Sequence, residues 1–158
     1  MEITIRAATE TDYAAVNLVF ADELAHHVAL LPERFQMADP IMSRRWFRDV
    51  LNEANKTLQL AVVDGRVVGL VLLIESVSSD DPIHRPRRFL YVDEISVAAE
   101  FRGQGIGRRL MQAAEQIAAS RAIPTVELNV WEANARAISF YERLGYRTVQ
   151  RRMVRDLP

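Results

Sequence analysis

The segment Arg102-Gly103-Gln104-Gly105-Ile106-Gly107 decides how this sequence is interpreted. It lies between an apolar stretch from Phe89 to Val97, which is typical of a strand, and an amphipathic stretch from Gly105 to Arg121, which is typical of a helix. The first backbone N–H groups of a helix are unpaired and converge at its positive end. Three glycines let the backbone approach a bulky anion closely. The segment therefore predicts an anion site, and a diphosphate is its natural ligand.

The same segment has a purely structural interpretation, because a strand-to-helix turn can need glycine only for its positive φ angles. Other phosphate motifs do not match. The lysine and hydroxyl residues of a Walker loop are missing, and the glycine spacing differs from that of dinucleotide-binding folds. Nucleotide hydrolysis and hydride transfer are therefore disfavoured. Charge from Arg102, Arg108 and Arg109 could supplement the backbone groups at this turn.

Hydrophobic periodicity predicts the elements that surround the turn. Asp64-Gly65 separates two apolar runs and favours a tight hairpin turn. Thr9 and Asp12 resemble a helix N-terminus, Pro32 ends that helix, and Gly145 is placed as a left-handed C-cap. In chain order we expect a strand at 3–5, helices at 9–32 and 42–51, strands at 58–63, 67–77 and 89–97, a helix at 105–121, a strand at 124–130, a helix at 134–144 and a strand at 146–154. This order is βααβββαβαβ, and its strand–helix–strand step predicts parallel pairing.

Composition limits the classes of protein to consider. A chain of 158 residues fits one domain, 1–158, and its formal net charge of −1 provides no global field for nucleic acid or an anionic membrane. There is no cysteine, so disulfides, thiolate metal sites and cysteine nucleophiles are excluded. The start lacks a signal pattern, and the longest apolar run, Val67 to Ile74, is too short to span a bilayer. We expect a cytoplasmic protein without a nucleic-acid or membrane partner.

Two linked motifs give the chain a family resemblance. Arg102, Gly105 and Gly107 match the acetyl-CoA signature of the GNAT superfamily of N-acetyltransferases, and the stretch from Tyr91 to Val97 is similar to the strand that precedes it. The later segment from Trp131 to Tyr146 resembles the second cofactor motif of this family, which places residues at Asn134, Ala137, Tyr141 and Gly145. The resemblance is strong from Phe89 to Tyr146, and the element order extends it over most of the chain.

The resemblance implies an α/β (α+β) fold of GNAT type. Its mixed, mostly antiparallel sheet would have six to seven strands and about four helices, and it would splay between the strands ending at Val97 and Val130. The implied co-substrate is acetyl-CoA, with no metal. The implied cofactor contacts are Ile95, Ser96 and Val97 for the pantetheine, Arg102, Gly103, Gln104, Gly105, Ile106, Gly107 and Arg108 for the pyrophosphate, and Asn134 and Tyr141 for the cofactor arm and sulfur.

The expected reaction is attack of a neutral amine on a thioester, and it needs a base to take a proton from the ammonium form. Asp93 and Glu94 are the candidates. Neighbours in a regular strand face opposite sides, so only one should reach the cleft unless a bulge intervenes. Asp93 shares the parity of Ile95 and Val97, and we favour it slightly. The alternative is that one or both carboxylates simply form surface ion pairs.

Tyr141 matches a family tyrosine whose hydroxyl can protonate the departing thiolate, although a tyrosine beside Phe140 can also be a core aromatic. The resulting hypothesis is an N-acetyltransferase that acts on a primary amine, with small molecules ranked first. The alternatives are a non-catalytic acyl-CoA-binding module, transfer of another acyl group, and a protein or peptide acceptor. His26 and His27 are left out of the site, and a homodimer is a further expectation from the family.

Overall fold

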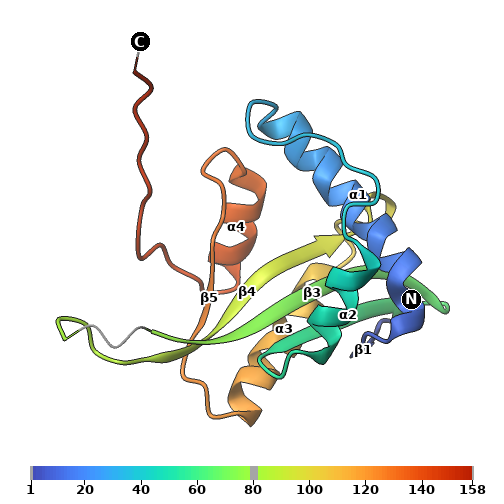
Figure 1. The fold of residues 1–158 in the computed structure, drawn as a ribbon, viewed down its shortest axis with the longest axis horizontal. Helices are drawn as coiled ribbons and strands as arrows, with labels where there is room; N and C mark the ends of the chain where they lie inside the picture. Colours follow the sequence, from blue (N-terminus) through green and yellow to red (C-terminus); the bar gives the residue numbers. More distant parts are fainter. Residues whose placement is uncertain (1, 79–81, 158) are drawn as a thin grey trace.

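The computed structural model describes residues 2–78 and 82–157, and a five-stranded sheet forms its centre (Figure 1). The strand order in space follows the chain order, β1-β2-β3-β4-β5. The strands are β1 Thr4–Ala7, β2 Lys56–Val63, β3 Arg66–Val77, β4 Arg88–Val97 and β5 Val126–Leu128. The helices are η1 Glu10–Asp12, α1 Tyr13–Leu30, α2 Arg44–Asn52, η2 Ala99–Phe101, α3 Ile106–Ser120 and α4 Ala135–Arg143.

Strand pairing follows the predicted local signals. β1 to β4 pair antiparallel, and β5 pairs parallel to β4 across the α3 connection. The β2–β3 turn has positive φ at Asp64 (48°) and Gly65 (77°), as the Asp-Gly pair predicts. The mixed, mostly antiparallel sheet and the four α-helices are thus confirmed.

Apolar side chains pack on both faces of the sheet. On one face α1 and α2 contribute Val16, Val19, Phe47 and Val50 to a cluster with Leu60 and Leu72. On the other face α3 contributes Leu110, Met111 and Ala114 to a second cluster with Val71 and Leu90. Burial of these side chains supplies the main driving force that fixes the helices on the sheet.

A β-bulge in β4 interrupts the alternation of its side chains. Leu73 pairs with Val92 and Leu72 with Glu94, so Asp93 is an extra residue in the ladder. Consequently Val92 and Ile95 contact the same core cluster, although a regular strand would send them to opposite faces. The β4–β5 pairing also ends at Val92 and Leu128, so the predicted splay begins where the bulge lies.

The predicted number of six to seven strands is wrong for the described part of the chain, which contains five. The missing element is the strand expected at 146–154. Residues 147–157 are extended and unpaired, and the C-terminal segment runs clear of the domain (Figure 1). Alternation of side chains predicts that a segment can form a strand, but a strand exists only where a neighbouring strand accepts its backbone hydrogen bonds.

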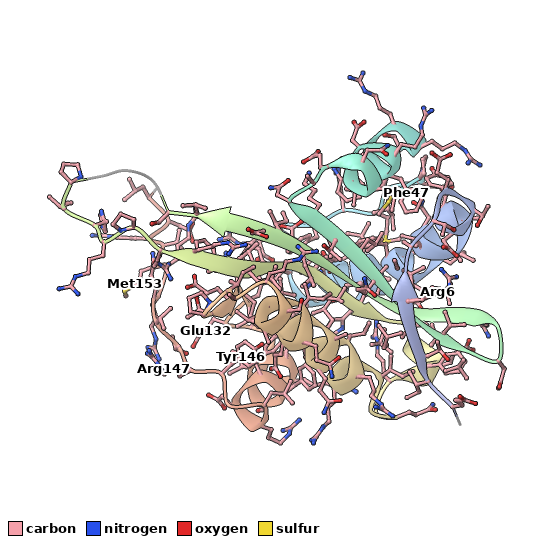
Figure 2. The ribbon with its side chains drawn as sticks, turned by 90° about the horizontal axis from the view of Figure 1, so that it is seen from below. Arg6, Phe47, Glu132, Tyr146, Arg147 and Met153 are labelled. Atoms are coloured by element: carbon pink, nitrogen blue, oxygen red, sulfur yellow. The ribbon has the colours of Figure 1, made fainter. Side chains whose placement is uncertain are left out.

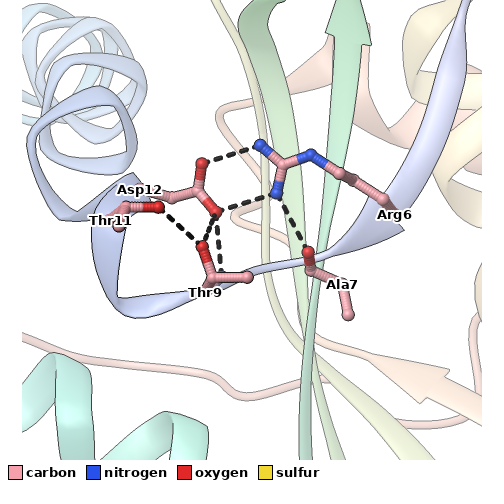
Figure 3. Close-up of polar contacts among 5 residues, drawn as sticks. All are labelled: Arg6, Ala7, Thr9, Thr11 and Asp12. Atoms are coloured by element: carbon pink, nitrogen blue, oxygen red, sulfur yellow. Dashed lines mark hydrogen bonds and ion pairs between the residues drawn. The ribbon is translucent and has the colours of Figure 1, made fainter.

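An ion pair between Arg6 and Asp12 stabilises the junction between β1 and α1, and Asp12 also accepts hydrogen bonds from Thr9 just before the helix (Figure 3). Arg6 Nη1 and Nη2 donate to the two oxygens of Asp12 at 2.8 and 2.7 Å. The Thr9 N–H and hydroxyl donate to Asp12 Oδ2 at 2.8 and 2.9 Å. These contacts, the Arg6 bond first, lower the pKa of Asp12 to about 2. The predicted Thr9–Asp12 start of the first helix is therefore confirmed.

Within residues 2–78 and 82–157, no helix combines the length and apolar character that crossing a bilayer requires.

Candidate active site

The glycine turn opens α3 with a run of backbone donors. Gly103 and Gly105 adopt φ of 78° and 86°, and Gly105 is the N-cap of the helix. The first helical bond at this end runs from Arg109 N–H to the Gly105 carbonyl. The N–H groups from Gly103 to Arg108 therefore have no acceptor among the residues that the structure describes. This donor set at the positive end of a 15-residue helix matches an anion.

The turn also leaves open space in front of its donors, as a bound pyrophosphate would require. A Cβ added at Gly103 or Gly105 would meet no atom within 4 Å, so the backbone faces open space there. At Gly107 an added Cβ would meet Phe140 Cζ at 3.3 Å, which shows that α4 packs closely on the start of α3. The turn is thus an accessible cradle with one wall supplied by the second sequence motif. A coenzyme A diphosphate would be held by these amides.

Side chains of the turn mainly hold it in place. Arg102 Nε donates to the Val97 carbonyl at 2.9 Å, and its Nη2 donates to the Asp22 carbonyl at 3.2 Å and lies 3.7 Å from Glu23. Gln104 donates to the Glu100 carbonyl at 3.1 Å. The guanidinium of Arg102 therefore fastens the turn to β4 and α1. Arg108 and Arg109 are both exposed and remain the arginines of the predicted set that are available to an anion.

A cavity of about 460 Å³ lies on the α1 face of the sheet, beside the splay. Its walls come from α1, the 31–43 loop, α2, β3 and β4. Both candidate bases, Asp93 and Glu94, line it together with Glu23 from α1. The bulge explains why neighbouring residues of one strand reach one cavity, which is the exception that the sequence interpretation allowed. The other lining residues are Phe20, Leu24, His27, Phe35, Ile41, Met42, Ser43, Trp46 and Leu72.

Glu94 has the electrostatics of a general base. Burial first, and then the charges of Glu23 and Asp93, together raise the pKa of Glu94 to about 8. Asp93, by contrast, is exposed. A carboxyl whose pKa lies near neutral pH is well matched to accept a proton from an ammonium group. The structure thus separates the two carboxyls by environment, whereas the sequence slightly favoured Asp93.

Tyr141 has features of both sequence interpretations, a core aromatic ring and a hydroxyl that could donate a proton. Its ring packs against the α3-side core and lies edge-on to Tyr146 at 6.0 Å. Its hydroxyl has no hydrogen-bond partner in the described part of the chain. Burial raises the pKa of Tyr141 above 10, and the charges of Glu23 and Glu94 add to the shift. The hydroxyl is therefore protonated and within electrostatic range of the candidate base.

The remaining predicted contacts are positioned by local structure. Ser96 is buried and donates to the Val19 carbonyl at 3.1 Å, while Ile95 and Val97 pack on the α3 side. The side chain of Ile106 is 1% exposed, so only its backbone N–H can face a ligand. Asn134 caps α4 by accepting from Ala137 N–H at 3.1 Å. Of these residues, Asn134 has an amide nitrogen with no hydrogen-bond partner in the described part of the chain, so this group can donate to a ligand.

Sequence reasoning missed the residues that complete the cavity. Glu23 lies 3.4 Å from His27, whose ring stacks on Phe35 at 4.9 Å. Phe35 then contacts Trp131 edge-on at 5.5 Å, so the 31–43 loop reaches the segment before α4. No motif marks Glu23 or Phe35. The i,i+4 spacing of Glu23 and His27 on a helix was the one available signal, and it is common on helix surfaces.

Among residues 2–78 and 82–157, no group of three or more His, Cys, Asp or Glu side chains is placed to hold a metal ion. The donor set at the turn consists of backbone N–H groups, which bind anions and not cations.

Comparison with known proteins agrees with this geometry. Residues 22–146 match the family described as the acetyltransferase (GNAT) family. An uncharacterized N-acetyltransferase of Archaeoglobus fulgidus is 33% identical over 98 residues, which are 62% of this chain and 65% of that protein. N-alpha-acetyltransferase 30 of Schizosaccharomyces pombe is 30% identical over 55% of each chain. The aligned parts thus span little more than half to about two thirds of these relatives.

Solved structures show the same fold. A mutant protein from Bacillus halodurans superposes with a TM-score of 0.94 at 24% identity, covering 98% of this chain and 99% of that one. An aminoglycoside N-acetyltransferase in complex with CoA superposes with a TM-score of 0.70 at 14% identity, covering 98% and 99%. The family match extends over most of the chain and includes the glycine turn, the bulged strand and the α4 motif. The chain belongs to the GNAT family of acetyltransferases.

Proposed function

We propose that the protein transfers the acetyl group of acetyl-CoA to a primary amine of a small molecule, with Glu94 as general base and Tyr141 as general acid. The observation that carries this proposal is the half-buried carboxyl of Glu94, whose pKa is raised to about 8 in a cavity beside the splayed strand. An anion cradle lies at the far end of the same strand, which is the arrangement that a long co-substrate with a terminal thioester requires.

We assign a residue to each of the two proton transfers that involve the protein. When bound, acetyl-CoA supplies the electrophilic thioester carbonyl. Glu94 takes a proton from the ammonium group, and the free amine then forms the new C–N bond while the C–S bond breaks. The acylated nitrogen loses its second proton to solvent and becomes the amide nitrogen. The Tyr141 hydroxyl provides a proton for the departing thiolate. Beyond Val92 no described strand pairs with the β5-facing edge of β4, so backbone groups there are available to the cofactor arm.

The cavity favours an acceptor that carries a second positive charge. Glu23 and Asp93 place carboxylates beside Glu94 in this cavity, while no lysine or arginine is among the lining residues. Arg102 offsets part of the Glu23 charge at 3.7 Å. Phe35 and Trp46 add aromatic walls, which attract cationic groups. A small polycationic amine satisfies this lining better than an amino acid with a free carboxylate.

Two solved neighbours that share this fold, at 18% and 14% identity, are named aminoglycoside acetyltransferases. The relative named N-alpha-acetyltransferase 30 instead supports a protein acceptor as the second candidate. The contact between Phe35 and Trp131 favours a small-molecule acceptor. It joins the 31–43 loop to the segment before α4 and so narrows the path by which an acceptor could enter the cavity between them.

Thiol release from acetyl-CoA tests the acceptor class with three amines of equal chain length. All three have a primary amine at one end of a five-carbon chain. At the other end cadaverine has a second amine, pentylamine has a methyl group, and 5-aminopentanoate has a carboxylate. We expect kcat/KM to be highest for cadaverine, lower for pentylamine and lowest for the aminopentanoate. The affinity of the protein for acetyl-CoA, measured by calorimetry, should be the same in the presence of each amine. Activity that is equal for the three amines would contradict the acidic-cavity argument. Release only with peptide N-termini would favour the second candidate.

A further inference from the structure

Two aromatic side chains from opposite sides of the sheet meet beside the acceptor cavity. Phe35 belongs to the loop between α1 and α2, and Trp131 belongs to the segment between β5 and α4. Their ring centroids lie 5.5 Å apart at 85°, which is an edge-to-face contact. Phe47 of α2 lies on one side of the sheet, whereas Glu132 and Tyr146, which flank α4 in the sequence, lie on the other (Figure 2). The contact therefore joins the acceptor side of the site to its cofactor side.

The end of α1 fixes the position of Phe35. The Leu31 N–H donates to the His27 carbonyl at 2.8 Å, and the Phe35 N–H donates to the Leu31 carbonyl at 3.1 Å. The Phe35 ring also stacks on the imidazole of His27, with 4.9 Å between the ring centroids and 17° between the ring planes. His27 belongs to the last turn of α1. Phe35 is therefore held both by a backbone turn and by a ring of the helix itself.

The start of α4 fixes the position of Trp131. The Asn134 N–H donates to the Trp131 carbonyl at 2.8 Å, and the Asn134 side chain caps α4. The Arg34 guanidinium lies 5.5 Å from the centre of the Trp131 ring, which is a cation–π contact from the residue beside Phe35. Two consecutive residues of the α1–α2 loop thus contact this indole, although Trp131 is 41% exposed.

One of the two rings forms a wall of the acceptor cavity. Phe35 lines the cavity together with Trp46, whereas Trp131 is not among the lining residues. Trp131 lies beyond Leu128, the last β5 residue that pairs with β4, so the contact bounds the cavity towards the splay. The volume of about 460 Å³ suits a small molecule. An acceptor with more bulk towards α4 would meet the Phe35 ring.

We infer that Phe35 is a specificity-determining residue of the acceptor cavity, and that Trp131 is a positioning residue that holds the Phe35 ring in place. The pair sets an upper limit to the bulk that an acceptor can carry beside its reacting amine. A larger acceptor would have to displace Phe35 from both His27 and Trp131, and such a clash discriminates against it. The inference rests on the proposed function for the acceptor being an amine, and it adds the size limit.

Two diamines of equal charge and equal spacing test the size limit. Cadaverine and meta-xylylenediamine both separate their amines by five carbons, but the second compound carries a benzene ring. The wild type should prefer cadaverine. In Phe35→Ala the ratio of kcat/KM for cadaverine to kcat/KM for meta-xylylenediamine should fall by about tenfold or more, as expected when a steric clash is removed. Met37→Ala is the control, because Met37 is 55% exposed in the same loop and lies outside the cavity lining, and it should keep the wild-type ratio.

A double-mutant cycle tests whether Trp131 acts through Phe35. Trp131→Ala should lower the same ratio, although Trp131 lies outside the cavity lining. The double variant should lower the ratio no further than Phe35→Ala alone, because both changes remove the same contact. A wild-type ratio in Trp131→Ala, or additive effects of the two changes, would overturn the positioning role. A wild-type ratio in Phe35→Ala would overturn the size limit and would leave the proposed acetyl transfer intact.

Binding measurements separate the size limit from the proposed reaction, because they need no turnover. In calorimetry in the presence of CoA, Phe35→Ala should bind meta-xylylenediamine about tenfold more tightly than the wild type does, and it should bind cadaverine no more tightly. This result without thiol release for any amine would contradict the proposed function and would support the size limit. Equal affinities of the variant and the wild type for meta-xylylenediamine would overturn the size limit, whatever the turnover.

Discussion

One extra residue in β4 decides which side chains can do chemistry. Because Asp93 bulges out of the ladder, the Glu94 side chain turns to the α1 face and joins Glu23 in the cavity. Burial there raises the pKa of Glu94 to about 8. A lone carboxylate on a regular strand would be solvated and would have too low a pKa to deprotonate an amine efficiently.

Glu94→Gln should lower kcat/KM by about a hundredfold or more, because a positioned general base contributes at least that much. In the wild type, kcat/KM should rise with pH up to about 8 and then level off, because the deprotonated carboxyl is the active form. The rising limb should be absent in the variant. Asp93→Asn, at the exposed neighbour, is the control, and an equal loss in both variants would contradict the assignment.

The same variant should be more stable than the wild type at alkaline pH. A carboxyl whose folded pKa is raised stabilises the fold only while protonated, so its contribution falls between pH 4.5, the unfolded value, and about pH 8. The Tm difference between Glu94→Gln and wild type should therefore be larger at pH 8 than at pH 5. A pH-independent difference in Tm would show that the Glu94 carboxyl is not buried in its charged form.

Tyr141→Phe should reduce kcat by about tenfold or more and leave acetyl-CoA affinity unchanged, since only the hydroxyl is removed. Tyr146→Phe is a matched control: its ring also packs on the core, but its hydroxyl donates to Glu115 at 3.3 Å. Turnover measurements and calorimetry on the two variants check this. Equal kcat for Tyr141→Phe and wild type would leave Tyr141 only a packing role.

At the scale of elements, the glycine turn can be tested against a second glycine of the same backbone type. Gly105 and Gly65 have φ of 86° and 77°, and an added Cβ would meet no atom at either position. Alanine at each should therefore cost about 1 kcal/mol of stability. Only Gly105→Ala should weaken acetyl-CoA binding, by about tenfold. Equal affinities of the two variants in calorimetry would place the pyrophosphate elsewhere.

The β1–α1 junction gives a prediction for stability alone. Asp12→Asn should lower the free energy of unfolding by about 1–2 kcal/mol at pH 7, since Arg6 and Thr9 lose a charged partner. The folded pKa of Asp12 is lowered, so its stabilisation is present above 3.8 and is lost as pH falls towards about 2. Urea unfolding at several pH values measures this. Asp49→Asn, at an exposed site, should change little.

Local signals predicted the elements well because their causes are local. The Asp64-Gly65 turn, the Thr9–Asp12 helix start and the Gly105 N-cap each follow from the backbone preferences of two or three residues. The bulge at Asp93 could not be located in this way. It depends on how β3 and β4 align over many residues, and the sequence of β4 alone contains no glycine or proline that marks it.

At the scale of the whole molecule, the two halves of the site differ in how far sequence could predict them. The cofactor side is a continuous segment from β4 to α3, so its motif contains its geometry. The acceptor side combines Glu23, Phe35 and Trp46 from elements without a motif, and only the packed fold brings them together. The C-terminal segment shows the opposite relation between sequence and fold. Its residues alternate as those of a strand do, but no described strand of the chain pairs with it.

The most direct test of the central claim is amine-dependent thiol release from acetyl-CoA by the full-length protein, with cadaverine as acceptor and mass spectrometry of the product. We predict saturable release, one thiol for each acetylated amine, with the rate rising as pH approaches about 8. Saturable acetyl-CoA binding without thiol release for cadaverine or any other amine or peptide acceptor would contradict it and would identify a binding module instead.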